Sequence, residues 1–121
     1  MSKTVLTVDD SPSIRRMIAL TLREAGYDVL EANDGQEGFN LATAQRVDAI
    51  ITDQNMPNMD GLSMIRALRA HPHGQGVPIV VLSTDSTENL KDQARAAGAL
   101  GWMVKPFTQD KLLAVIRKVL G

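Results

Sequence analysis

Five short apolar runs, each followed by a segment suited to a helix, constrain the fold of this chain more than any other feature. The clearest run, residues 49–51, leads directly into a carboxylate at Asp53, and turn-forming residues follow it at 57–61. A short apolar run bounded by turn residues is typical of a buried strand. Strands that alternate with helices favour a parallel sheet with helices on both faces, joined by right-handed crossovers. We therefore predict an α/β fold.

Periodicity and end signals place the individual elements. Ser11 and Pro12 are residue types preferred at the start of a helix, and Gly26 is typical of a helix end. The helix predicted at 87–97 has a thin apolar stripe, so we expect it to be held weakly to the sheet. The predicted strands are 4–8, 27–32, 47–52, 77–82 and 100–104. The first predicted helix begins at Pro12, the second covers 36–44 and the third covers 61–70. The last predicted helix follows a cap at Thr108.

Two local features have both a structural and a functional interpretation. His71 and His73 lie in a loop-like segment and are two residues apart, which would suit a metal, but no third ligand is near them in sequence, so we favour a solvated loop. Gly38 lies within a predicted helix, where glycine costs about 1 kcal/mol relative to alanine. We interpret it as allowing that helix to approach the sheet closely.

The composition excludes several classes of protein. A chain of 121 residues suits one domain, and the absence of cysteine excludes disulfides and zinc–thiolate sites. The net charge of −1 gives no electrostatic reason to expect nucleic-acid binding. The N-terminal segment has the features of neither a signal peptide nor a membrane span. We expect a cytoplasmic monomer with neither nucleic acid nor membrane as a partner.

Polar side chains follow four of the five predicted strands. Asp9 and Asp10 follow the first strand, Asp53 the third, Ser83 the fourth and Lys105 the fifth. Because the carboxyl ends of parallel strands share one edge, we expect these groups to converge. Carboxylates this close repel unless a cation intervenes, and oxygen ligands suit Mg²⁺. The set suits phosphoryl transfer to Asp53, with Mg²⁺ and Lys105 neutralising the phosphoryl oxygens and Ser83 donating to one of them.

Each part of this set also has a simpler interpretation. An Asp-Asp pair at a strand end is more often a helix cap with a solvated neighbour, and a Lys-Pro pair is usually the start of a loop. The specificity comes from four strand ends that each carry suitable chemistry. We also predict that the Lys105–Pro106 bond is cis, because cis costs only about 0.5–1 kcal/mol before proline and would direct the lysine towards Asp53.

The motifs at these strand ends resemble the receiver domains of two-component response regulators over the whole chain, and the single-domain chemotaxis regulators in particular. The matching residues are 8–11 with Arg15, 53–61, Ser83, Gly98, Ala99, Gly101 and 105–107. The resemblance implies a flavodoxin-like, doubly wound (βα)5 fold with a five-stranded parallel sheet in the order 2-1-3-4-5. It also implies that residues 1–121 form one receiver domain without an output domain.

The resemblance assigns a role to each acidic residue. Asp53 would accept a phosphoryl group from a phosphohistidine on a sensor histidine kinase. Asp10, Asp53 and the main-chain carbonyl of Asn55 would bind Mg²⁺ directly, and Asp9 would bind it through water. The chain would then catalyse only its own phosphorylation and dephosphorylation.

The same resemblance makes Ser83 the switch hydroxyl, Lys105 the phosphate-binding lysine and Trp102 the switch aromatic. Three residues depart from the family's common pattern. Trp102 replaces a tyrosine or phenylalanine, Ser83 replaces a threonine, and Gln54 stands where related chemotaxis regulators often carry an aromatic residue. We expect Trp102 to be more exposed in the unphosphorylated state and more buried in the phosphorylated state.

We expect a signalling module of chemotaxis type rather than an enzyme. Its effector would be the flagellar motor switch, bound through the surface formed by helix 87–97, strand 100–104 and the last helix. The alternative is a phosphate sink or phosphorelay intermediate without an effector of its own. A Mg²⁺-dependent phosphatase is disfavoured because the chain has no cap or substrate-binding insertion. An interaction module that needs no phosphorylation is disfavoured by the complete acid, lysine and hydroxyl set.

Overall fold

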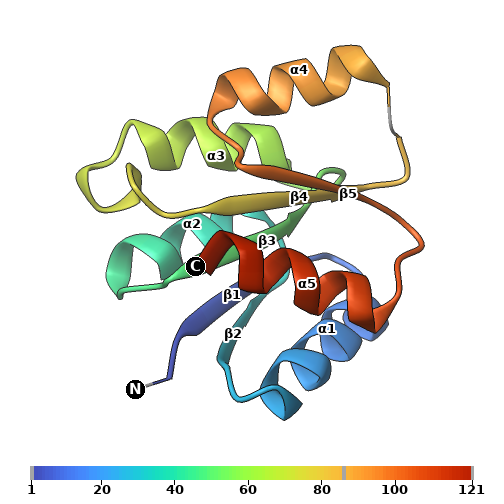
Figure 1. Ribbon diagram of the computed structural model, residues 1–121. Helices are drawn as coiled ribbons and strands as arrows, with labels where there is room; N and C mark the ends of the chain where they lie inside the picture. The colour runs from blue at the N-terminus through green and yellow to red at the C-terminus, as the bar shows by residue number, and fades with distance from the viewer. Residues whose placement is uncertain (1, 86, 121) are drawn as a thin grey trace.

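The structure, a computed structural model, describes residues 2–85 and 87–120 (Figure 1). Five strands alternate with five α-helices, and one turn of 3₁₀ helix precedes the fourth strand. The strands are β1 (Thr4–Val8), β2 (Asp28–Ala32), β3 (Ala49–Asp53), β4 (Ile79–Ser83) and β5 (Gly101–Val104). The helices are α1 (Pro12–Glu24), α2 (Gly35–Ala44), α3 (Gly61–Arg69), η1 (Pro72–Gly74), α4 (Glu88–Ala97) and α5 (Gln109–Leu120).

The five strands form one parallel sheet in the order β2-β1-β3-β4-β5, which confirms the predicted flavodoxin-like topology. Helices α1 and α5 cover one face, and α2, α3 and α4 cover the other (Figure 1). Strand residues alternate between the two cores: Leu6 and Val8 pack beneath α2 and α3, whereas Val5 packs beneath α1. A sheet buried on both faces explains why its strands read as nearly continuous apolar runs.

Local capping explains where the first helix begins and ends. The Ser11 hydroxyl accepts a hydrogen bond from the Ile14 N–H, and Pro12 occupies the first helical position. The chain leaves the helix through Gly26, whose φ of 97° is readily adopted by glycine. These contacts confirm the predicted start and end of α1.

Some predicted boundaries were wrong by one or two residues. Strand β4 begins at Ile79, not residue 77, because Pro78 has no N–H to donate to a neighbouring strand. Both β3 and β4 extend one residue further than predicted, so that Asp53 and Ser83 belong to the strands. The segment predicted as a loop at 71–76 contains η1, because the His71 ring accepts from the His73 N–H at 3.1 Å.

The surroundings of Gly38 confirm that this glycine allows α2 to approach the sheet closely. A Cβ at this position would lie 2.9 Å from both the Met64 sulfur and a Val8 methyl group. Only a residue without a side chain lets α2 pack this closely against β1 and α3.

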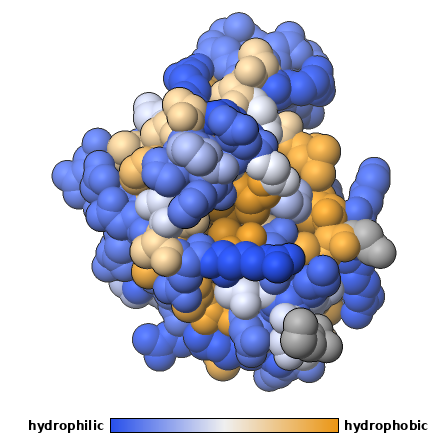
Figure 2. All heavy atoms as spheres, turned by 90° about the vertical axis from the view of Figure 1, so that its left-hand side faces the viewer, coloured by the Kyte–Doolittle hydropathy of each residue, from blue (hydrophilic) through white to orange (hydrophobic). Residues whose placement is uncertain are grey.

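The surface of the molecule is mainly polar where Figure 2 displays it. This view faces the left side of Figure 1, and hydrophilic side chains cover most of it, with apolar side chains visible in its middle. No helix within the described residues is long and apolar enough to cross a membrane.

Candidate functional site

The carboxyl ends of the strands bring the three predicted acids together at one edge of the sheet. A carboxylate oxygen from each of Asp9, Asp10 and Asp53 lies within 4.8 Å of the others. Asp9 and Asp53 are buried, with 1% and 8% of their surface exposed, whereas Asp10 is open to solvent. This arrangement fits Mg²⁺, which binds few carboxylates and keeps several waters on its open side.

Lys105 joins this acidic cluster from the end of β5. Its Nζ lies 3.0 Å from Asp53 Oδ1 and 3.2 Å from Asp9 Oδ2, so one ammonium pairs with two carboxylates. The Lys105–Pro106 peptide bond is cis, as predicted. The site therefore combines negative charge for a cation with a positive group suited to an anion.

The surroundings of Asp53 shift its pKa upwards from the ordinary value of a carboxyl. Burial raises the pKa of Asp53; the Lys105 ammonium opposes this shift and the Asp9 charge adds to it. Burial alone would lower the pKa of Lys105, but its ion pairs with Asp53 and Asp9 outweigh burial and raise it. A divalent cation between the acids would favour their ionised forms.

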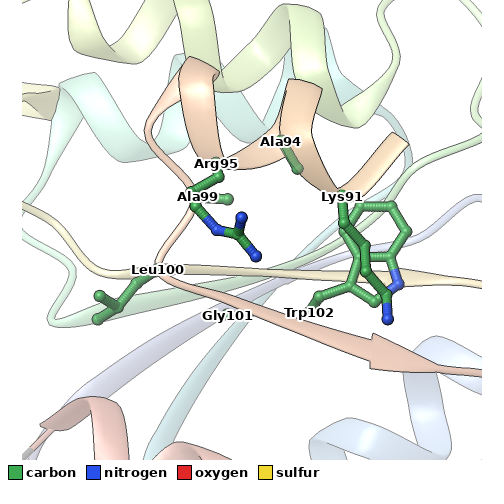
Figure 3. Close-up of a pocket in the computed structure, with 7 residues that line it drawn as sticks. All are labelled: Lys91, Ala94, Arg95, Ala99, Leu100, Gly101 and Trp102. Atoms are coloured by element: carbon green, nitrogen blue, oxygen red, sulfur yellow. The ribbon is translucent and has the colours of Figure 1, made fainter. Parts of the chain in front are cut away.

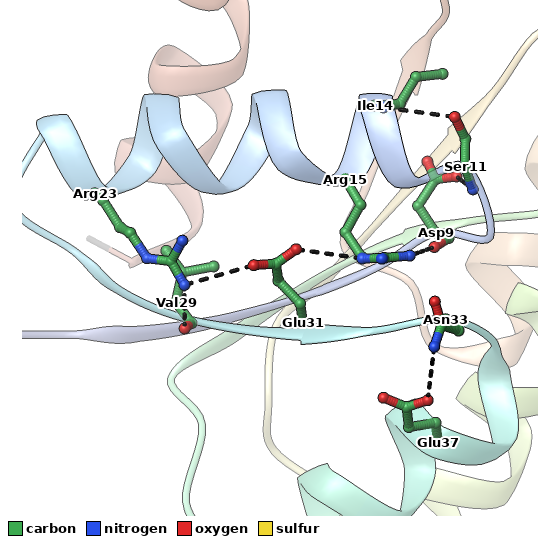
Figure 4. A network of polar contacts seen from close by, with 9 residues as sticks. All are labelled: Asp9, Ser11, Ile14, Arg15, Arg23, Val29, Glu31, Asn33 and Glu37. Carbon is green, nitrogen blue, oxygen red and sulfur yellow. Dashed lines mark hydrogen bonds and ion pairs between the residues drawn. The ribbon is translucent and has the colours of Figure 1, made fainter.

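An arginine from α1 supports the loop that carries the first two acids (Figure 4). Arg15 donates from Nη1 to the Asp9 carbonyl at 2.8 Å and from Nε to Glu31 Oε1 at 3.2 Å. Arg23 Nη2 lies 3.6 Å from the other Glu31 oxygen. Within the loop, the Ser11 N–H donates to Asp9 Oδ1 at 2.9 Å. Sequence reasoning included Arg15 in the motif but missed this support, which depends on β2 lying beside β1.

The loop after Asp53 is held by contacts that the sequence analysis also missed. The Gln54 side chain accepts from the Leu62 N–H at 3.0 Å, and Asp60 accepts from the Ser63 N–H at 2.8 Å. Asn58 adopts a positive φ of 67°, a conformation that asparagine tolerates, and its amide donates to Asp34. Two sequence features could have indicated these contacts: the unusual Gln54 after Asp53, and the turn that contains Asn58. Asn55 lies exposed in the same loop.

Ser83 lies at the end of β4, the strand beside β3. In the sheet register Asp53 lies opposite Leu82, so Ser83 is one residue beyond the strand position that faces Asp53. Ser83 is buried, and its Oγ accepts from the Asp85 N–H at 3.0 Å. This hydrogen bond connects the Ser83 hydroxyl with the loop that leads into α4.

Trp102 lies on β5 beneath α4 and is half-buried. Its indole N–H is buried and has no hydrogen-bond partner among the described residues. Figure 3 shows the shallow pocket between α4 and β5 that the indole helps to line. The other lining residues are Lys91, Ala94, Arg95, Ala99, Leu100 and Gly101. Trp102 thus packs on the face of the sheet that α2, α3 and α4 cover, and not in the core beneath α1 and α5.

Known proteins are similar to this sequence over nearly its whole length. A family model described as the response regulator receiver domain matches residues 5–117. A chemotaxis protein CheY homologue from Campylobacter jejuni is 40% identical over 119 residues, which cover 97% of this chain and 92% of that protein. Such a match extends well beyond the individual site motifs.

Solved structures agree with the sequence matches. Chemotaxis response regulator CheY4 of Vibrio cholerae has a TM-score of 0.95 and 42% identity, covering 99% of this chain and all of that one. The receiver domain of a sensor histidine kinase from Pseudomonas aeruginosa, with a magnesium ion coordinated in its active site cleft, has a TM-score of 0.92 and 31% identity over 100% and 99% of the two chains. This chain therefore belongs to the receiver domains of response regulators, which signal through phosphorylation.

Proposed function

We propose that this chain is a single-domain response regulator in which Asp53 accepts a phosphoryl group from a sensor histidine kinase. The contact of Lys105 with Asp53, inside a cluster of three acids, is the observation that carries this proposal. Receiver domains are signalling proteins rather than classical enzymes, so the outcome of the reaction is a changed binding surface. The chain covers 92% and 100% of two CheY relatives, and this agreement supports a CheY-like role.

The phosphoryl transfer makes one bond and breaks another. An Asp53 carboxylate oxygen attacks the phosphorus, the phosphorus–nitrogen bond to the donor histidine breaks, and the imidazole leaves with the electron pair. Lys105 lies where it can pair with a phosphoryl oxygen, and the Ser83 hydroxyl can donate a hydrogen bond to another. Mg²⁺, held by Asp10, Asp53 and the Asn55 carbonyl and through water by Asp9, would supply charge neutralisation.

The acceptor can be tested by mapping the acyl phosphate formed with acetyl phosphate and Mg²⁺. Asp53→Asn keeps the size of the side chain but removes the nucleophile, so the label should be lost. The matched control is Asp110→Asn, because Asp110 is an exposed aspartate on α5. This variant should be labelled like the wild type. Label retained by Asp53→Asn at the wild-type level would show that another residue is the acceptor.

We further propose that the effector is the flagellar motor switch. The names of the relatives from Campylobacter jejuni and Vibrio cholerae, both chemotaxis proteins, support this assignment. The alternative is a phosphate sink or phosphorelay intermediate that drains a kinase and has no effector. Motor switch protein from the source organism should retain the beryllofluoride-treated chain and not the untreated chain. Phosphotransfer from a kinase without such retention would favour the alternative.

A further inference from the structure

Gln54, the residue directly after Asp53, is turned back into the protein although it begins a surface loop. Only 7% of its surface is exposed. Its main-chain N–H donates to the Leu82 carbonyl on β4 at 3.1 Å. Its main-chain carbonyl accepts from the Gly61 N–H at 3.0 Å, and its side-chain Oε1 accepts from the Leu62 N–H at 3.0 Å. One residue thus connects the end of the sheet with the first turn of α3.

These bonds satisfy donors that a helix cannot satisfy by itself. The first N–H groups of a helix have no partner within it and need an acceptor from outside. In α3 the side chain of the ordinary cap, Asp60, accepts from the Ser63 N–H. The N–H groups of Gly61 and Leu62, which precede Ser63, both donate to Gln54. The start of α3 is therefore fixed to the residue beside the proposed phosphoacceptor, and not only to its own capping residue.

The close approach at this point leaves little freedom. A Cβ at Gly61 would lie 2.6 Å from the Asp53 carbonyl oxygen and 3.1 Å from Gln54 Oε1. Glycine lets α3 begin directly against the end of β3, and Gln54 fills the remaining space with a bonded side chain. An aliphatic or aromatic residue at position 54 would leave the Leu62 N–H without this acceptor.

We propose that Gln54 is a positioning residue for the metal site. Both ends of the segment 55–60 are tied together through Gln54, so the loop that carries the Asn55 carbonyl is held closed. A loop held in the conformation that the ion requires binds with a smaller ordering cost. This inference rests on the proposed function, because it is the phosphoryl-transfer chemistry that requires Mg²⁺ at Asp53.

The experiment compares Gln54→Met, which keeps the length of the side chain but removes the strong acceptor, with the wild type. Magnesium binding to the metal-free protein is measured by calorimetry with MgCl₂ alone, and hydrogen exchange of the Leu62 N–H is measured by NMR. We expect faster exchange of that N–H and about tenfold weaker Mg²⁺ binding, the loss typical when support of a metal ligand is removed. Gln54→Glu keeps the acceptor oxygen and should bind Mg²⁺ at least as tightly as the wild type.

A matched pair at Asp60 separates positioning from simple capping. Asp60→Ala removes the cap of the same helix turn, and Asp60→Asn removes the same charge but keeps the cap. The two Asp60 variants should bind Mg²⁺ equally well, even where the urea midpoint of Asp60→Ala falls as far as that of Gln54→Met. Two results would overturn this inference alone. One is a wild-type Mg²⁺ affinity in Gln54→Met. The other is a loss of Mg²⁺ affinity in Asp60→Ala, relative to Asp60→Asn, that is as large as the loss in Gln54→Met. Absence of Mg²⁺ binding by the wild type would overturn the proposed function and the inference together.

Discussion

Helices α3 and α4 lie next to each other on one face of the sheet (Figure 1), but the sheet holds them very differently. Helix α3 buries residues along most of its length, whereas the only buried residue of α4 in the described chain is Ala94. The buried residues of α3 are Gly61, Leu62, Met64, Ile65 and Leu68. The thin apolar stripe predicted for 87–97 is confirmed by this pattern.

The difference in burial between α3 and α4 corresponds to a difference between the strand ends that precede them. Helix α3 begins after the loop that follows Asp53, which carries the Asn55 carbonyl proposed as a magnesium ligand. Helix α4 begins after the loop that follows Ser83, the proposed switch hydroxyl. Since hydrophobic stabilisation grows with buried apolar area, α4 can shift at a smaller cost than α3. The fold thus places a deeply packed helix after Asp53 and a loosely packed helix after Ser83.

The largest expected effect compares the same truncation in the two helices. Leu68→Ala in α3 removes a fully buried side chain and should lower the free energy of unfolding by about 2–5 kcal/mol. Leu90→Ala in α4 removes a half-buried side chain and should cost less than half as much. Urea denaturation of both variants measures the difference. Equal losses would show that α4 is held as firmly as α3.

A smaller effect is expected where the two helices are joined. Arg69, at the end of α3, donates to the Gly98 carbonyl after α4 and to the Gly74 carbonyl, both at 2.7 Å. Burial lowers the pKa of Arg69, but a guanidinium stays protonated in proteins. Arg69→Met keeps the apolar stem and should cost about 1–3 kcal/mol through the unpaired carbonyls.

Hydrogen exchange should locate the effect of Arg69→Met in the last turn of α4, with little change in the first turns of α3. Arg95→Met is the matched control, since the Arg95 side chain forms an exposed ion pair with Asp92 inside α4. Its loss should stay below about 0.5 kcal/mol. Uniformly faster exchange in both helices would contradict a local connection.

A spectroscopic change is expected beneath α4. Trp102 is the only tryptophan, so its fluorescence reports on one place in the molecule. Beryllofluoride, which mimics an aspartyl phosphate, should reduce acrylamide quenching of Trp102 in the presence of Mg²⁺, because the Ser83 loop and α4 move and the indole packs more deeply. The change should weaken in Ser83→Ala and vanish in Asp53→Asn. Unchanged quenching despite measured beryllofluoride binding would exclude Trp102 as the switch residue.

The smallest effect concerns acid. The Glu37 N–H and the Asn58 amide donate to Asp34 and hold its pKa below the ordinary value of 3.8. A carboxyl with a depressed pKa stabilises the fold above its unfolded-state pKa, and this contribution is lost as pH falls through the folded-state pKa. Asn58 lies in the loop before α3, whereas α4 is capped by the hydroxyl of Thr87, which does not titrate in acid.

Urea unfolding at about pH 5 and about pH 3 should therefore show a weaker pH dependence in Asp34→Asn than in the wild type. Thr87→Ser exchanges one non-titrating cap for another and should keep the wild-type dependence. An Asp34→Asn variant with the same pH dependence as the wild type would show that the contacts of Asp34 with Glu37 and Asn58 add no acid-sensitive stability.

Much of the site could be predicted because its residues follow strand ends. Once 4–8, 47–52, 77–82 and 100–104 are interpreted as parallel strands, geometry requires Asp9, Asp53, Ser83 and Lys105 to share an edge. The helices could be predicted from apolar periodicity and capping residues, because both depend on residues that are close together in the chain. The strand order came from the resemblance, and the exact ends of β3 and β4 were misplaced because they depend on which neighbour each strand pairs with.

The sequence by itself determined the alternation of strands and helices and the ends of α1, because these depend on residues close together in the chain. It also determined the chemistry at the sheet edge, because the carboxyl ends of parallel strands share one edge. Only the tertiary structure decided how those groups are supported. Arg15 meets Glu31 sixteen residues away, Gln54 meets Leu62 across a turn, and Arg69 meets Gly98 twenty-nine residues away. Such hydrogen bonds leave no periodic trace in a sequence, since they form only after packing has brought distant segments within about 3 Å of each other.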